Sequence, residues 1–219
     1  EQRLEAIQVP EPWLCSSGEA RELAKKETIA KGIRVLSSPP VMVTALILIL
    51  AYTKNTFFRN NIEIIVPILL LGFVPLLAYP MQKVLPNFKD KGREGQRKLA
   101  FILNLIGYTV AMLWAIFSKV NKQLFLVCIT YFVTVVLLTI CNKVLHFRAS
   151  GHASCFTGPL LLLIYFVSWK AIFPCVLFCA LVIWSSLALK RHTMQELAGG
   201  IIVCAISFAL SLLLINIIF

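Results

Sequence analysis

Residues 123–142, QLFLVCITYFVTVVLLTICN, form a run of twenty uncharged and mostly apolar residues. A helix rises about 1.5 Å per residue, so this run spans about 30 Å, which is the thickness of the hydrocarbon core of a bilayer. Six further uncharged runs of about 17 residues or more occur at 37–53, 64–81, 99–118, 153–169, 171–189 and 197–219. Prolines within these runs are tolerated by transmembrane helices as kinks. The sequence therefore predicts an all-α integral membrane bundle of about six to seven transmembrane helices.

The composition of the chain agrees with this prediction. Its 219 residues are 59% hydrophobic and 14% charged, whereas ordinary soluble domains have about 45–50% and about 25%. The mean hydropathy is +0.84. These values exclude a disordered chain, a collagen-like repeat and an ordinary water-soluble domain.

Residues 1–36 differ in composition from the rest, and we expect them to form an amphipathic cytoplasmic or interfacial segment ahead of a transmembrane domain at 37–219. Leu23, Ile29, Ile33 and Leu36 recur at roughly helical spacing with lysines between them, which is typical of a helix at a membrane surface. A cleaved signal peptide is not expected, because the first apolar run begins only near residue 37.

The positive charges are distributed unequally between the two sides of the predicted bundle. The chain has 21 Lys and Arg, 10 Asp and Glu, and a formal net charge of +11. With seven spans, all but five of the positive residues share the side of the N-terminus, and the exceptions are Lys54, Arg59, Lys119, Lys122 and Lys170. The positive-inside rule predicts that this basic side is cytoplasmic. Membrane lipids are its expected partners and nucleic acid is not, because an adjacent membrane itself supplies anionic groups.

Three polar segments lie at span ends on this basic side. They are PNFKDKGREGQRKLAF at 86–101, FRASGHASCFTGP at 147–159 and WSSLALKRHTMQELAGG at 184–200. Two spans separate the first segment from the second, and two more separate the second from the third. An even number of spans returns the chain to the same face, so the sequence predicts one interfacial pocket that contains cations, two histidines and a carboxylate.

These residue types suit phosphoryl transfer, in which catalysis is mostly positioning and electrostatic stabilisation. His192 and Glu196 are four residues apart, so on one helical face the carboxylate would accept one ring N–H and leave the other nitrogen free as a nucleophile. Gly151 would let the backbone approach a phosphate, and Ser150 would donate a hydroxyl. A protonated His152 would supply a proton to the leaving group.

The SGH segment and the later H-x-x-x-E segment resemble motifs of the type 2 phosphatidic acid phosphatase superfamily of membrane lipid phosphatases, over about residues 85–200. The resemblance implies that His192 is the nucleophile, that Glu196 orients it in place of an Asp, and that His152 is the general acid. It also implies that Ser150 and Gly151 bind phosphate. For the basic first motif of the family, which is K-x-x-x-x-x-x-R-P, the candidates here are Lys89, Arg93 and Arg97.

Two departures from the family pattern concern the phosphate site. Ala149 stands where the family has Pro, and Ser186 stands where the family has an Arg that clamps the phosphate. A hydroxyl does not replace a bidentate guanidinium group. Arg148, Lys190 and Arg191 are the candidates to replace it in space.

The sequence predicts a membrane-embedded lipid phosphatase that acts on a phosphomonoester or diphosphate of an isoprenoid, polyprenyl or glycerol lipid through a phosphohistidine. The alternative is a non-catalytic protein that binds a lipid phosphate, such as a pseudoenzyme, a transporter or a scaffold. Neither a metal ion nor another cofactor is expected. The seven cysteines lie mostly in apolar runs, so we expect them to be buried small hydrophobic residues.

Overall fold

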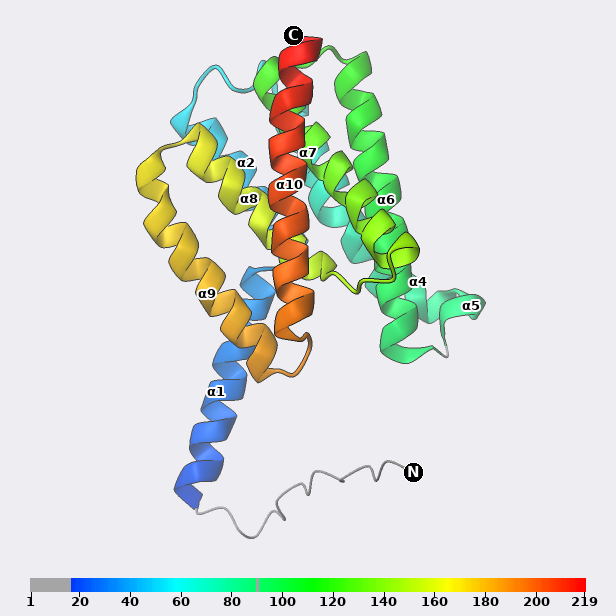
Figure 1. The fold of residues 1–219 in the computed structure, drawn as a ribbon, viewed down its shortest axis with the longest axis vertical. Helices are drawn as coiled ribbons and strands as arrows, with labels where there is room; N and C mark the ends of the chain where they lie inside the picture. The colour runs from blue at the N-terminus through cyan, green and yellow to red at the C-terminus, as the bar shows by residue number, and fades with distance from the viewer. Residues whose placement is uncertain (1–16, 90) are drawn as a thin grey trace.

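The computed structural model describes residues 17–89 and 91–219, and within them it is helical with no strand (Figure 1). The polar stretch at 1–16 lies outside these residues. Five helical stretches are long and apolar enough to cross a membrane, and they are Asn61–Val84, Glu94–Phe117, Lys122–Val144, Trp169–Ala188 and Met194–Ile218. The predicted all-α bundle with the character of an integral membrane protein is therefore confirmed.

Two of the seven predicted spans differ from the other five. The run at 37–53 forms α2 (Pro39–Thr53), which passes the same test of length and hydropathy only together with α1 (Ser17–Leu36), from which it is bent by 55°. The run at 153–169 forms α8 (Gly151–Phe166), whose 16 residues rise only about 24 Å. Up to six spans result when the bent pair is taken as one.

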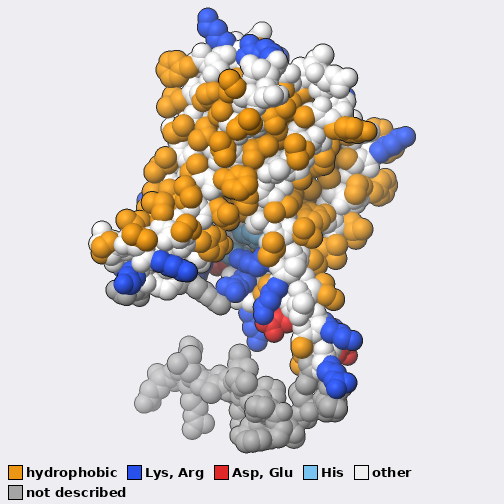
Figure 2. Space-filling model, turned by 180° about the vertical axis from the view of Figure 1, so that it is seen from behind, with side chains coloured by type: hydrophobic (Ala, Val, Ile, Leu, Met, Phe, Trp, Pro, Cys, Tyr) orange, Lys and Arg blue, Asp and Glu red, His pale blue; other side chains and the backbone are white. Residues whose placement is uncertain are grey.

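The centre of the bundle is formed by α7 (Lys122–Thr139), which packs against both α6 (Gly92–Phe117) and α10 (Met194–Ile218) (Figure 1). Large apolar side chains from α2 and α7 fill the core, and Leu46, Leu50, Leu124 and Val127 are all fully buried. The face of the bundle seen in Figure 2 is largely apolar, and many large apolar side chains of the described residues are exposed. Apolar flanks around an apolar core are what a helical bundle surrounded by lipid requires.

The stretch from Asn61 to Val84 changes its helical geometry three times. It begins as α3 (Asn61–Pro67), continues as the π-helix η1 (Ile68–Phe73) and the 3₁₀-helix η2 (Val74–Leu77), and ends as α4 (Ala78–Val84). Pro67 ends the first segment and Pro75 lies in the third. Because proline has no N–H to donate, the hydrogen-bond pattern shifts near each one, and the stretch still continues through the prolines as expected.

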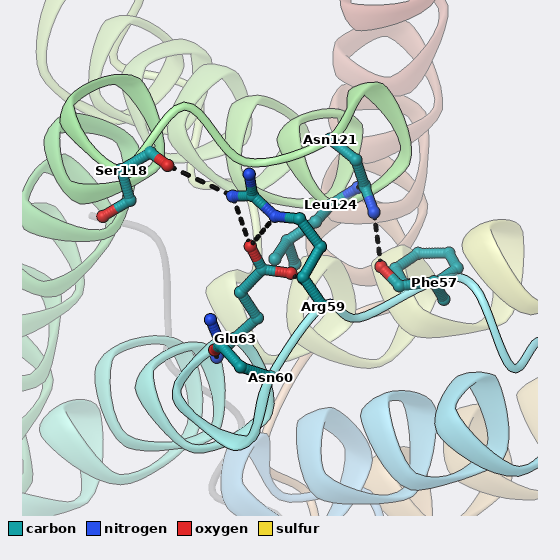
Figure 3. A network of polar contacts seen from close by, with 7 residues as sticks. All are labelled: Phe57, Arg59, Asn60, Glu63, Ser118, Asn121 and Leu124. Carbon is teal, nitrogen blue, oxygen red and sulfur yellow. Dashed lines mark hydrogen bonds and ion pairs between the residues drawn. The ribbon is translucent and has the colours of Figure 1, made fainter.

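Two loops are joined at the end of the bundle that carries the C-terminus (Figures 1 and 3). Arg59 donates from its backbone N to Oε2 of Glu63 at 2.8 Å and from Nε to Oε1 at 2.6 Å, and its Nη2 donates to the carbonyl of Ser118 at 3.1 Å. Asn121 caps α7 and donates to the carbonyl of Phe57 at 2.6 Å. These bonds place residues 57–63 and 118–121 at one end, as the predicted alternation of spans requires.

The opposite end carries α1, which leaves the bundle beside α9 (Ile172–Ala188) (Figure 1). The bend between α1 and α2 follows from the sequence Ser38–Pro39–Pro40. A residue before proline favours an extended backbone, and Ser38 has φ −72° and ψ 151°. This break directs α1 across the end of α9. α1 ends at Leu36, and the expected division of the chain into two domains there stays a prediction.

Candidate functional site

The candidate site lies at the end of the bundle from which α1 projects. Figure 2 shows Lys and Arg side chains gathered there, below a broad apolar surface that we call the apolar belt. Part of a histidine is exposed where the apolar and the basic surfaces meet. The connection between α9 and α10, the start of α8 and the first turns of α6 meet at this end. Segments that are far apart in the sequence therefore contribute to one polar cluster.

The turn that carries His192 is built by two capping motifs. At the end of α9, the N–H of Arg191 bonds to the carbonyl of Ser186 and the N–H of Lys190 bonds to that of Leu187, with Lys190 at φ 49°. This is the Schellman arrangement of a helix C-terminus. Thr193 then caps α10, since its hydroxyl accepts the N–H of Glu196 at 3.2 Å. His192 is held between the two motifs.

Glu196 contacts two partners with its two carboxylate oxygens. Nδ1 of His192 lies 2.9 Å from Oε2, and Nε of Arg148 lies 3.1 Å from Oε1. A carboxylate can only accept, so Nδ1 carries the hydrogen and Nε2 keeps its lone pair. The sequence predicted that His192 and Glu196 lie on one helical face. They do not, because α10 begins at Met194 and His192 precedes it. The cap at Thr193 brings them together instead.

The environment of His192 favours its neutral form. Its side chain is 9% exposed, and burial lowers the pKa of the imidazole below 6.5. The Glu196 carboxylate acts in the opposite direction, but the charges of Arg97 and Arg34 add to the lowering. A neutral imidazole with a free Nε2 is the form that acts as a nucleophile at neutral pH.

The start of α8 is fixed to the first turns of α10. The backbone N of Ser150 donates to the carbonyl of Glu196 at 2.9 Å, and the Ser154 hydroxyl donates to the carbonyl of Gly200 at 2.8 Å. A Cβ at Gly200 would overlap the Ser150 carbonyl and would lie 2.7 Å from Cβ of Ala153. Glycine at position 200 therefore permits the close approach of α10 to α8.

Ser150 and Gly151 have different roles in this segment. Ser150 is fully buried, and its Oγ accepts the backbone N–H of Ala153 at 3.2 Å, so the hydroxyl caps α8. Gly151 is partly exposed, and a Cβ there would meet nothing within 4 Å. The N–H groups of the first helical turn have no acceptor within the helix. Gly151 and the start of α8 thus offer open space and backbone donors to an anion.

His152 contacts the N-terminal part of the chain. Its Nε2 lies 3.2 Å from Oγ of Ser37, and that hydroxyl donates to the carbonyl of Arg34 at 3.2 Å. Nε2 therefore carries the hydrogen and Nδ1 has the free lone pair. Burial lowers the pKa of His152 to about 3, and the charges of Arg34 and His192 add to this effect. The ring is neutral in the absence of an anion.

The structure brings some of the expected phosphate ligands together and leaves others apart. Arg97, in the first turns of α6, interacts electrostatically with Arg148, Glu196 and His192. Lys89 and Arg191 are exposed, and neither side chain makes a hydrogen bond or ion pair with the described residues. Lys89 is on α5 (Pro86–Lys89), at the edge of the bundle and away from α9 (Figure 1). The Arg93 side chain lies outside the described part.

The sequence pattern did not identify Arg34 and Ser37 as site residues. Arg34 belongs to the segment that was expected to lie at the membrane surface, Ser37 begins the first predicted span, and their spacing matches no motif. The signal in the sequence is the Pro39–Pro40 pair, because the break there bends α1 by 55° from α2 and lets it pack beside α9. Leu23, Ile29 and Leu36, which are also on α1, have exposed side chains, and their contact with lipid stays a prediction.

Comparison with known proteins adds no relative to this description. No protein-family model matches the chain, and no curated protein or solved structure matches it. The functional argument therefore depends on the geometry of the site.

Proposed function

We propose that the chain is a membrane-embedded lipid phosphatase that hydrolyses the phosphomonoester or diphosphate of a polyprenyl or glycerol lipid. The observation that carries the proposal is the pairing of His192 Nδ1 with Glu196 Oε2 at 2.9 Å, with Arg148 on the other carboxylate oxygen. This pairing leaves Nε2 of a buried, neutral imidazole free to attack. Cations and a second histidine lie beside it.

In the first step, Nε2 of His192 attacks phosphorus and the bond from phosphorus to the leaving oxygen breaks. The leaving oxygen takes a proton from His152. His152 is neutral without substrate, and the negative charge of the phosphate favours its protonated form. A monoanionic substrate brings the proton that Nδ1 of His152 accepts and then transfers. The products are a phosphohistidine and the lipid alcohol, or the lipid monophosphate when a diphosphate is cleaved.

In the second step, water attacks the phosphohistidine. His152 is neutral after the first step, so it accepts the proton of the water as the new phosphorus–oxygen bond forms. The phosphorus–nitrogen bond breaks, its electron pair returns to Nε2 of His192, and inorganic phosphate leaves. Arg148 and Arg97 stabilise the charge on the phosphoryl oxygens during both steps.

A lipid substrate fits the position of the cluster at the edge of the apolar belt. The hydrocarbon tail would remain in the bilayer against the apolar flank, and the headgroup would meet the basic end of the bundle. By the positive-inside rule this end faces the cytoplasm.

The second candidate function is binding of a lipid phosphate without turnover. Ser186, which is 1% exposed, is the observation that favours it, because the resembled family has a phosphate-binding Arg at this position. A binding protein does not require a histidine held in one tautomer by a carboxylate, so we place this function second.

The test is phosphate release by the purified protein from phosphatidic acid, phosphatidylglycerol phosphate, and polyprenyl phosphate and diphosphate. We expect release from at least one substrate, and a loss of about 10³-fold or more in kcat for His192→Ala, as for other nucleophile deletions. His146→Ala is the matched control, because His146 is an exposed loop residue at the same end of the bundle.

Two outcomes would count against catalysis. Wild-type turnover by His192→Ala would exclude the phosphohistidine. Lipid phosphate binding without phosphate release from any substrate in the panel would favour the non-catalytic function.

A further inference from the structure

We propose that Arg34 of α1 binds the phosphate group in the site, so that the N-terminal helix completes the binding pocket; this inference rests on the proposed function. The sequence pattern assigned this helix to the membrane surface. The contacts of one face of α1 point to a direct role instead.

One face of α1 is directed into the molecule. Ala30 and Ser37 are fully buried, and Ile33 and Arg34 are partly buried between them. Their spacing of three, four and seven residues is that of neighbours on one side of an α-helix. Lys31, on the same helix, is exposed and pairs with Glu27 at 2.8 Å. Arg34 thus belongs to the packed face and Lys31 to the solvated one.

Two hydrogen bonds fix this face over the site. The Ser185 hydroxyl donates to the carbonyl of Ala30 at 2.6 Å, which attaches α1 to α9. Oγ of Ser37 lies 3.2 Å from Nε2 of His152, which attaches the other end of the face to the start of α8. Arg34 lies between these two attachment points, and its Nη1 is buried.

The charge of Arg34 acts on both histidines and favours the neutral form of each. The guanidinium group is therefore close to the proposed nucleophile and the proposed acid. Arg97 and Arg148 act at the same place, since both interact with the carboxylate of Glu196. Guanidinium groups beside a histidine nucleophile suit a phosphomonoester dianion, because each can donate two parallel N–H bonds to phosphate oxygens.

The position of Arg34 also addresses the missing arginine at Ser186. The contact that attaches α1 to α9 is made by Ser185, the residue before Ser186. Arg34 follows Ala30 by one turn of α1, so this contact brings the helix that carries Arg34 next to the position where the resembled motif has its own arginine. Arg148, which the sequence offered as a replacement, contacts Glu196 through Nε, so Arg34 would bind the phosphate together with Arg148 and not in its place.

The test compares Arg34→Gln and Arg34→Lys with the control Lys31→Gln in the full chain. One measurement is kcat and KM for lipid phosphate release. The second is the rise in thermal unfolding midpoint that inorganic phosphate or orthovanadate causes in detergent. For Arg34→Gln we expect kcat/KM to fall about 10- to 100-fold, the effect of a lost charge-assisted hydrogen bond, and the anion-induced rise to disappear. Lys31→Gln should match the wild type in both.

The outcomes separate this inference from the proposed function. Unchanged kinetics and an unchanged anion effect in Arg34→Gln would overturn the role of Arg34 and leave the phosphatase intact. An Arg34-dependent anion effect in a protein that releases no phosphate would overturn the phosphatase and support phosphate binding by Arg34.

Arg34→Lys covers the case in which Arg34→Gln does not fold. Lysine keeps the charge but not the planar fork, so KM should rise about 10-fold. An unchanged KM in a folded Arg34→Lys protein would overturn the inference. Phosphatidylglycerol, a phosphodiester lipid, should not replace orthovanadate in the unfolding measurement, and equal stabilisation by it would show a general affinity for anionic headgroups instead.

Discussion

Glu196 is the residue through which the parts of the site are connected. Its carboxylate contacts His192 and Arg148, its backbone carbonyl accepts the N–H of Ser150, and its own N–H is capped by Thr193. In an ordinary capping box the glutamate side chain would return to the N–H of the capping residue. Here the carboxylate is directed to a histidine and an arginine, which is the arrangement that the proposed chemistry needs.

The pKa of His192 depends on Glu196, so replacing Glu196 should change how the activity depends on pH. Burial lowers the pKa of His192 below 6.5, while the Glu196 carboxylate raises it by stabilising the imidazolium form. In Glu196→Gln this stabilisation is lost, so the pKa falls further. The acidic limb of the pH profile of kcat/KM, which reports the free enzyme, should move to lower pH. The maximum should also fall about 100-fold or more, because the imidazole loses its orientation.

The direction of the shift is the decisive measurement for Glu196. A limb that moves to higher pH would contradict the placement of His192 beside this carboxylate. His146→Ala, at the same basic end, should leave the limb of the wild type in place.

At the scale of the elements, α6 and α9 end in the same way. In α6, the N–H of Val120 bonds to the carbonyl of Ala115 and the N–H of Lys119 bonds to that of Ile116, with Lys119 at φ 47°. In α9, Lys190 has the same left-handed conformation at φ 49°. A lysine in this conformation is strained, because its Cβ approaches the following carbonyl.

Replacing Lys119 should therefore stabilise the protein. In Lys119→Gly, the strain of the left-handed residue is relieved, and we expect the free energy of unfolding to rise by about 1 kcal/mol. For a chain of this length this corresponds to an increase of about 2–4 °C in the thermal unfolding midpoint. The control is Lys54→Gly, because Lys54 has φ −135° and gains nothing from glycine. A lower midpoint in Lys119→Gly would contradict the cause given for the strain.

At the scale of the whole molecule, the two ends of the bundle differ in charge. The end with the Arg59–Glu63 network holds the loops together, and the other end contains the histidines and most of the cations (Figures 2 and 3). The bundle has a continuous apolar flank between the two ends (Figure 2). A membrane around this flank would keep the ends on opposite sides.

The orientation can be measured with two cysteine substitutions at exposed positions. Asn87→Cys lies on α5 at the basic end, and Lys170→Cys lies in η4 (Trp169–Ala171) between α8 and α9. In intact cells, a membrane-impermeant maleimide should label Lys170→Cys above the level of the unsubstituted protein and should not label Asn87→Cys until the membrane is permeabilised. The reverse pattern would place the site outside the cytoplasm.

The helices and their apolar character followed from the sequence alone. Uncharged runs of this length have few stable alternatives to membrane helices, because every backbone polar group must be satisfied within the chain. The even number of spans between motifs placed the three polar segments at one end. The His192–Glu196 pair was also predicted from spacing, although the pairing comes from a cap and not from a helical face.

Only the tertiary structure decided which cations meet the histidines. Lys89 was a candidate from the resembled basic motif and Arg191 as a replacement for the missing arginine, but the side chains of both are exposed. Arg34 comes from a segment more than a hundred residues away from both histidines, and its position depends on a bend at Pro39–Pro40 and on the Ser185–Ala30 contact. Local patterns determine helices because their hydrogen bonds are local, whereas the composition of the pocket depends on how those helices pack.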